Sequence, residues 1–297
     1  MSVYLHKFAT QAECDAYTES EYYIEPFTAL IAENSGKVVY NVTSGSPVPP
    51  GPTPPPPVDY TSMPFTVEVV SGSGNFWITP NGDSNDYLHY SLDGGENWIL
   101  INNSSTSLTV NAGDTIQIKG YNQVCDNAES RGGGILSEGS GSGLKYVFYG
   151  NIMSLVREDD FENMVTFPSS DMCFKEFFGS IYYGPACAGL VSAEHLILPA
   201  TTLTEDCYRE MFASCTGLTT APELPAATLA DCCYQSMFNG CSSLNYIKCL
   251  VPNISSTYTY NWTYGVSSTG TFVKNANATW TTGTSGIPNN WTVQDAS

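Results

Sequence analysis

The sequence predicts a mainly β protein with short helices, in which an N-terminal anchor, a β-sandwich and a short repeat solenoid with a C-terminal cap follow one another. Three observations predict it. Nearly the same block of residues occurs twice, 26 positions apart, between Leu198 and Leu244. Alternating apolar segments separated by turns precede this repeat, and a proline-rich stretch precedes them. A fixed period in this range indicates a solenoid, whose units bury their apolar sides against their neighbours.

Residues 1–45 are expected to form a small anchoring or docking unit. The segments 22–24, 27–31 and 37–40 have the composition of short strands. A core this small is marginal alone, so the unit is expected to dock onto another protein. Residues 46–58 form the linker that follows, because eight of these 13 residues are proline. We expect a semi-rigid spacer of about 3.1 Å per residue, and the alternative is a docking peptide for a proline-binding domain.

Residues 59–150 are predicted to form an immunoglobulin-like β-sandwich. Phe65, Val67 and Val69 alternate with polar residues, and Asp93 begins a glycine-containing turn before the next apolar segment. Strands at intervals of 8–12 residues with such turns are typical of this fold. The pattern from Tyr90 to Trp98 resembles bacterial and phage sandwiches that bind carbohydrate or act as spacers.

Residues 151–254 are predicted to form the solenoid, and 255–297 its C-terminal β cap. Apolar residues four apart predict that each unit contains a helix with one buried face. In the second unit these are Leu229, Cys233, Met237 and Cys241, widened by Tyr234 and Phe238. Thr202 and Thr228 have the spacing to an acidic residue that is typical of helix N-caps. Before each helix a short extended segment is expected, with Leu218, Pro222 and Leu224 facing inward.

The repeated motif resembles a known family. Leu-Pro-Ala-Thr-Thr-Leu, Cys-Tyr, Met-Phe and Cys-Thr-Gly-Leu within residues 198–218 are similar to the BspA-like leucine-rich repeats of gut Bacteroidales and their phages. The resemblance extends to 150–155, 270–275 and 286–293, roughly half of the chain. It implies a surface-exposed binding or structural role and no particular chemistry. The opening residues 5–8, 25–26 and 40–41 resemble the first segment of many Bacteroidales-phage virion proteins.

Composition restricts the function. Ten Lys and Arg residues stand against 29 Asp and Glu, a net charge of −19, and the cations form no cluster. We therefore expect no nucleic-acid partner and no anionic membrane surface as partner. The first 20 residues hold no apolar run, and the chain holds no apolar stretch of 18 residues, so no secretory signal and no membrane span are predicted. Synthesis in a host cytoplasm is expected.

No catalytic centre, cofactor or metal is predicted. The three histidines, His6, His89 and His195, lie in three different modules, and no Cys-x-x-Cys motif occurs. The acidic groups at 159–162 and 81–86 are interpreted as solvated turns, with a calcium site as the alternative for both and a carboxylate pair as a further alternative at 159–162. Seven of the ten cysteines occupy repeat positions and are expected to be buried free thiols, with disulfides or metal ligation as the alternatives; they are Cys173, Cys187, Cys207, Cys215, Cys233, Cys241 and Cys249.

These expectations favour a non-enzymatic phage virion protein, a capsid- or tail-attached fibre or decoration protein on the virion surface. Residues 1–45 are expected to bind other virion proteins, and a homo-oligomer is expected, with a trimer favoured. A host-surface polysaccharide or protein is the expected ligand. The alternative is a bacterial cell-surface adhesin, and a polysaccharide-cleaving enzyme ranks last. The outward side of the repeat strands is the candidate ligand-binding surface, with Thr219, Ala221 and Glu223 in one unit and His195 and Ile197 in the unit before.

Overall fold

The computed structural model describes residues 58–80, 87–102, 105–121, 136–138, 142–167, 174–180, 184–185, 187–252 and 254–296. The chain divides into two units, Met1–Val58 and Asp59–Ser297. The expected anchor, 1–45, and all but the last residue of the expected linker, 46–58, lie outside the described residues. The second unit is mainly β with few helices, as predicted.

Seven strands form the first part of this unit: β1 (Phe65–Ile78), β2 (Tyr87–Ser91), β3 (Ile99–Asn102), β4 (Thr106–Asn111), β5 (Thr115–Tyr121), β6 (Leu136–Glu138) and β7 (Ser142–Asn151). They pair in the order β7-β1-β5-β2-β3, and β4 and β6 also pair with β1. Residues 65–68 of β1 pair with β5, and residues 73–78 pair with β4. Gly72, at φ +75°, lies between these two parts of the strand. The first part of β1 therefore pairs with β5 and the second part with β4.

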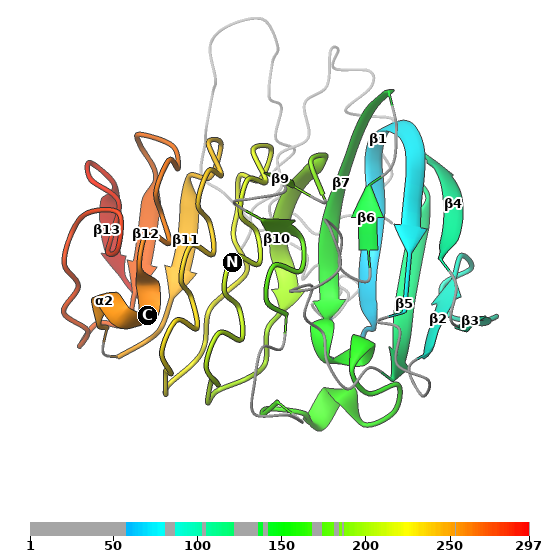
Figure 1. Cartoon of the computed structure of the whole chain (residues 1–297), viewed down its shortest axis with the longest axis horizontal. Helices are drawn as coiled ribbons and strands as arrows, with labels where there is room; N and C mark the ends of the chain where they lie inside the picture. The colour runs from blue at the N-terminus through cyan, green and yellow to red at the C-terminus, as the bar shows by residue number, and fades with distance from the viewer. Residues whose placement is uncertain are drawn as a thin grey trace, which may run out of the picture. The chain divides into compact units, whose positions relative to one another are not determined.

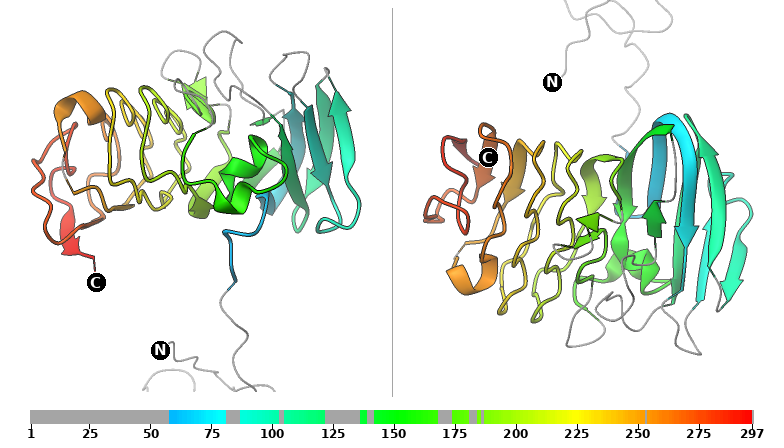
Figure 2. Two further views of the ribbon diagram at one scale, coloured as in Figure 1. Left: turned by 90° about the horizontal axis from the view of Figure 1, so that it is seen from below. Right: turned by 45° about the horizontal axis from the view of Figure 1, so that its top comes forward.

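A parallel ladder continues from this sheet through the rest of the unit. β7 pairs in parallel with β10 (Leu190–Ile197), and further on β11 (Tyr246–Cys249), β12 (Thr271–Lys274) and β13 (Thr292–Asp295) pair in parallel. Between β10 and β11, Thr220 bridges both Ser192 and Tyr246. The chain thus returns to the same side once per coil, about every 26 residues, and successive coils lie side by side (Figures 1 and 2).

The predicted helices within the repeats are wrong, because the coils close through consecutive tight turns. Asp206, Glu210 and Ser214 all have φ near +60°, which an α-helix does not allow. From residue 206 to 215 the amides alternate in their acceptors: the amide of Tyr208 donates to Cys233 O in the next coil, and that of Met211 donates to Tyr208 O three residues back. Half of the amides therefore join neighbouring coils. The expected N-caps Thr202 and Thr228 instead bridge each other in parallel.

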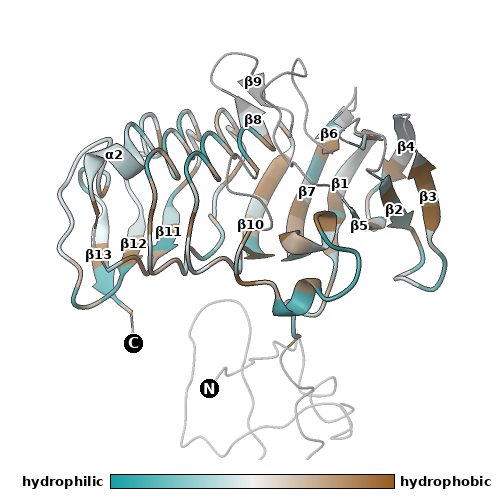
Figure 3. Ribbon diagram, turned by 60° about the horizontal axis from the view of Figure 1, so that its bottom comes forward, coloured by the Kyte–Doolittle hydropathy of each residue, from teal (hydrophilic) through white to brown (hydrophobic). Residues whose placement is uncertain are grey.

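The inward residues of the turns are those the sequence predicts. Cys207, Met211, Cys215 and their counterparts in the next coil are fully buried, together with Tyr208 and Phe212. A spacing of four suits this backbone better than a helix, because residues four apart drift by about 40° around a helix of 3.6 residues per turn. Hydrophobic and hydrophilic positions alternate along each coil (Figure 3).

Aromatic rings join the core of the sheet to the core of the coils. Phe178 packs against Phe148 of β7 at 4.6 Å between ring centroids and against Phe212 at 5.3 Å. Phe212 stacks on Phe238 at 5.7 Å, and Phe238 contacts Trp262 at 6.0 Å. The sheet and the coils therefore share one continuous hydrophobic core.

Short elements complete the unit. Two 3-10 helices, η1 (Ile152–Leu155) and η2 (Phe161–Asn163), follow β7, and β8 (Gly179–Ser180) pairs with β9 (Gly184–Pro185). The α-helix α2 (Ser256–Thr259) begins the residues that the sequence assigns to the cap. Those residues extend the ladder by two strands, β12 and β13.

Candidate binding surface

The surface predicted from the sequence lies along the parallel ladder, and the side chains of Thr219 and Glu223 already have polar intramolecular partners. Thr219 is half-buried, and its hydroxyl and its amide both donate to Val191 O, at 2.8 and 2.9 Å. Glu223 is exposed, with its carboxylate 2.7 Å from Lys248 Nζ of β11. The charges of Glu223 and Lys248 thus neutralise each other, and a ligand at this position would meet their ion pair and no unpaired charge.

The assignment of Ala221 to this surface is wrong, because its side chain is only 3% exposed. Leu218, Ala221 and Leu224 are buried at intervals of three residues, and Pro222 is buried as well, so burial in this segment does not alternate. A pleated strand would alternate, but this segment contains Pro222 and forms only isolated bridges at Thr220 and Leu224. The predicted burial of Leu218, Pro222 and Leu224 is confirmed.

The other two predicted residues lie on β10. His195 is exposed, although one face of its ring stacks on Tyr60 at 4.5 Å and 6° between ring planes. Tyr60 also contacts Tyr149 of β7 edge-on at 5.6 Å. Burial, and then the carboxylate of Glu68, raise the pKa of Tyr149, so this phenol stays neutral at ordinary pH. Ile197 is half-buried. The segment that contains Tyr60 therefore covers part of the predicted surface.

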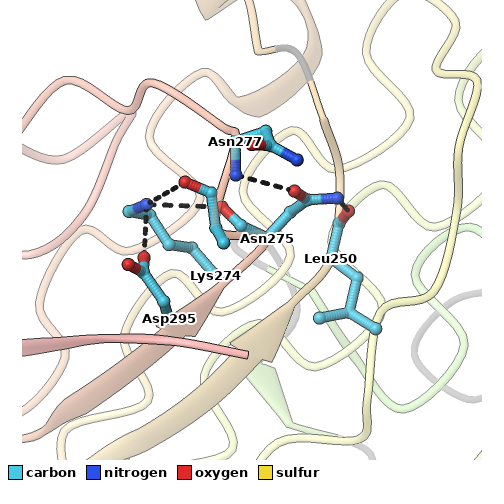
Figure 4. Close-up of polar contacts among 6 residues, drawn as sticks. Leu250, Lys274, Asn275, Asn277 and Asp295 are labelled. Atoms are coloured by element: carbon cyan, nitrogen blue, oxygen red, sulfur yellow. Dashed lines mark hydrogen bonds and ion pairs between the residues drawn. The ribbon is translucent and has the colours of Figure 1, made fainter. Parts of the chain in front are cut away.

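The far end of the ladder is closed by its own polar contacts (Figure 4). Lys274 Nζ donates to Asp295 Oδ1 at 2.6 Å and to the carbonyl oxygens of Asn275 and Ala276 at 3.3 and 3.4 Å. Asn275 donates to Leu250 O at 3.4 Å, which ties the end of β12 to the preceding coil. All three donors of the ammonium group are used. This cluster holds β13 in place and leaves the Lys274 ammonium group no donor for a ligand.

A second surface, which the sequence reasoning missed, lies on the outer face of β2 and β5. The antiparallel register places Tyr87 beside Tyr121 and His89 beside Lys119. These four side chains are half-buried, while Leu88, between Tyr87 and His89, and Gly120, between Lys119 and Tyr121, are buried. Alternation along the strands therefore gathers aromatic and charged groups on one side.

The connection after η1 adds two charged residues to this face. Glu158 Oε2 lies 3.3 Å from His89 Nδ1, and Oε1 lies 3.2 Å from Lys119 Nζ. The same ammonium group lies 4.5 Å from the ring centroid of Trp98. Burial, and then the negative charge of Glu158, raise the pKa of Tyr87, whose hydroxyl also hydrogen-bonds to that carboxylate. Glu158 is thus the acceptor at the centre of the group.

Arg157 lies beside this group and differs from the other cations there. Its guanidinium lies 5.5 Å over the ring of Tyr121, and the residue is exposed. No carboxylate among the residues that the structure describes forms an ion pair with it. We call Tyr87, His89, Trp98, Lys119, Tyr121, Arg157 and Glu158 the aromatic–cation face.

The sequence carries only a weak signal for this face. Tyr87 and His89 alternate with buried residues, which indicates that they face outward. Arg157, however, follows a 3-10 helix some 70 residues later, and only the packing of η1 against β5 brings it over Tyr121. Ser154 of η1 fixes that packing, because its hydroxyl donates to Ile118 O at 3.0 Å and accepts from the Phe65 amide.

Six of the seven cysteines at repeat positions are interior groups in the part of the chain that the structure describes. Cys187, Cys207, Cys215, Cys233, Cys241 and Cys249 are buried free thiols, whereas Cys173 lies outside the described residues. Burial raises the pKa of Cys233 and of Cys249 to about 12. The thiol of Cys241 donates to Phe212 O at 3.0 Å, which links adjacent coils. Such groups are inert, because only the thiolate is nucleophilic.

Within the described ranges no three His, Cys, Asp or Glu side chains are placed to hold a metal ion. Asp159, Asp160 and Glu162 have exposed side chains, and the acidic stretch 81–86 lies outside the described residues. None of the helices that the structure describes has the length and apolar character needed to cross a membrane.

Comparison of this chain with known proteins gives no match to a family model, to a curated protein or to a solved structure.

Proposed function

We propose that this chain is a non-enzymatic phage virion structural protein, attached to the capsid or the tail as a fibre or decoration protein. In this proposal residues 1–45 attach to other virion proteins and residues 46–58 act as a spacer. An immunoglobulin-like sandwich and BspA-like leucine-rich repeats are then displayed outward, for adhesion to a host-surface polysaccharide or protein. The assembled form is a homo-oligomer, with a trimer favoured.

The observation that carries the proposal is the continuity of the second unit. Parallel pairing of β7 with β10 and of β11 with β12 and β13 is linked through isolated parallel bridges at Thr220, and one aromatic core runs from Phe148 to Trp262. A body of this kind presents side chains on a rigid support at fixed spacing. Such a support suits the display of a binding surface better than an enzyme reaction in which parts of the protein close over the substrate. The resemblance of its repeats to surface-exposed proteins of Bacteroidales and their phages supports the same role.

Mass spectrometry of purified virions tests the location. We expect peptides from both units in gradient-purified particles, at a constant ratio to the major capsid protein, and none in the envelope fraction of uninfected host cells. Recovery from the host envelope and not from virions would replace the proposal with a bacterial cell-surface adhesin. Release of oligosaccharides from host capsule by the purified protein would contradict the non-enzymatic assignment.

The ladder surface is tested separately by charge reversal. Glu223→Lys replaces the carboxylate of the ion pair with an ammonium group, so that two cations lie side by side at this position and at Lys248. If this surface contacts the host, binding to host cells should weaken. The matched control is the exchanged pair Glu223→Lys with Lys248→Glu, which restores the attraction in the opposite direction. Unchanged cell binding by the single variant would remove the ladder surface from the proposal.

A further inference from the structure

We propose that the aromatic–cation face binds an acidic saccharide, with the sugar carboxylate on Arg157 and the pyranose ring against the tyrosines of β2 and β5. The proposal rests on the proposed role in host-surface adhesion and names the class of ligand and the site. It concerns the outer face of the sheet, and not the ladder surface predicted from the sequence.

Arg157 supplies the anion-binding group. Lys119 pairs with Glu158, Arg209 with Asp206 and Lys248 with Glu223, whereas neither Arg157 nor Lys145 has a carboxylate partner among the described residues. Arg157 is exposed, and its guanidinium lies over the ring of Tyr121, a kind of contact that arginine commonly makes with aromatic faces. A guanidinium held in this way can bind a carboxylate through two parallel hydrogen bonds. At physiological salt, charges more than about 8 Å away are largely screened, so of the chain's net charge of −19 mainly the neighbouring Asp159, and Glu158 with its partner Lys119, act on this site.

The two tyrosines supply aromatic surface next to that cation. The rings of Tyr87 and Tyr121 have centroids 6.4 Å apart and planes that differ by 21°, so the two rings are nearly parallel across the two strands. The C–H face of a pyranose packs well against aromatic rings of this kind. Hydroxyl groups around the sugar need both donors and acceptors, and Lys119 and Glu158 provide these at the border of the rings.

A saccharide fits this face better than a peptide does. Extended peptides bind sheets by pairing with the backbone of an edge strand. β2 and β5 are interior strands, because β2 lies between β5 and β3, and β5 lies between β1 and β2. Their backbone groups are already paired, so a ligand meets only side chains. A sugar acid can bind through contacts with side chains alone.

The test is a binding titration with the purified full-length protein at ~150 mM salt. The probes are oligogalacturonate as the acidic saccharide, a neutral galactan oligosaccharide of the same length, and polyglutamate as an acidic peptide. Of the three probes, we expect only oligogalacturonate to bind measurably. Arg157→Gln should weaken it about tenfold or more, and Arg157→Lys should weaken it less, because lysine keeps the charge but loses the paired donors.

Lys145→Gln is the matched control. Lys145 is exposed on β7 and is not part of the aromatic–cation face, so its replacement changes the net charge equally and should leave binding unaltered. Circular dichroism of each variant confirms that the fold is intact. Equal binding of the neutral saccharide, equal binding of polyglutamate, absence of binding, or an equal loss in Lys145→Gln would each overturn the proposal. None of these results bears on whether the protein is found in virions, which tests the proposed function independently.

Discussion

Trp262 is the residue on which the C-terminal coils depend most. Its ring is fully buried, stacks on Trp280 at 5.5 Å and donates through Nε1 to Gly286 O at 2.8 Å. Trp262→Ala removes these contacts and leaves a cavity, so the free energy of unfolding should fall by about 3–5 kcal/mol. Urea denaturation followed by circular dichroism measures this change.

Tyr260→Ala is the control for that experiment. Tyr260 lies two residues away and is 56% exposed, so its removal should change the stability by less than about 0.5 kcal/mol. Similar losses in the two variants would contradict the burial of Trp262 in the core.

The reactivity of the thiols should follow their burial. Cys232 is half-buried, and its pKa is raised by burial and then by the carboxylate of Asp206. Because iodoacetamide reacts with the thiolate, native labelling at pH 8 should modify Cys232 before its buried neighbour Cys233, and faster as the pH rises. Asp206→Asn lowers the pKa of Cys232 and should accelerate its labelling.

Peptide mass spectrometry identifies the labelled cysteines. Glu205→Gln is the control for Asp206→Asn, because Glu205 has the smallest of the effects that raise the pKa of Cys232. Labelling of Cys233 as fast as that of Cys232 in the native protein would show that the coils open or that the thiol is not buried.

At the scale of the elements, Gly240 distinguishes consecutive turns from the helix that the spacing of four suggests. Gly240 has φ +80°, and a Cβ there would meet Ser214 Cα at an ordinary contact distance of 3.4 Å. In a helix Gly→Ala would stabilise by about 1 kcal/mol. In this backbone Gly240→Ala should destabilise by about 1–2 kcal/mol, because a side chain disfavours positive φ.

Thermal unfolding of Gly240→Ala and Gly240→Asn tests whether these substitutions stabilise or destabilise the protein. Asparagine tolerates positive φ better than alanine, so Gly240→Asn should lose less stability. Stabilisation by alanine would favour the helix over the turns.

The sequence predicted which residues of each repeat face inward, but it did not predict the backbone that places them there. Period and burial follow from side-chain type, so Met211 and Phe212 were assigned correctly. The choice between helix and turns depends on amides such as that of Tyr208, which donate to a neighbouring coil. One signal was present: inward residues occur as adjacent pairs at a strict spacing of four, which a helix could not keep on one face.

The candidate surfaces were less predictable than the fold. Ala221 was misplaced because alternation was assumed in a segment in which the adjacent residues Ala221 and Pro222 are both buried. The stacking of His195 on Tyr60, and the position of Arg157 over Tyr121, join residues far apart in the chain. Local pattern carries no information about such contacts.

At the scale of the whole molecule, the shared core predicts that the sheet and the coils unfold together. Phe212→Ala removes a ring that packs between Phe178 and Phe238 within the coils. Because Phe178 also packs on Phe148 of the sheet, the loss should accelerate amide hydrogen exchange in β5 as well as in β11. Hydrogen-exchange mass spectrometry of peptides from both strands measures this.

Leu92→Ala is the control, since Leu92 is 54% exposed and should not alter exchange in either strand. Exchange that accelerates in β11 alone would show that the sheet and the coils are separate folding units.

Because each coil bonds only to the coil on either side, the length of this body is adjustable. Duplicating one block of 26 residues adds a coil and one more strand to the ladder, and lengthens the stack by about 4.8 Å. The outer face of β2 and β5 and the contacts of Lys274 would stay unchanged at the two ends. Tandem duplication within the gene could therefore alter the reach of the protein in discrete increments without redesign of either terminus.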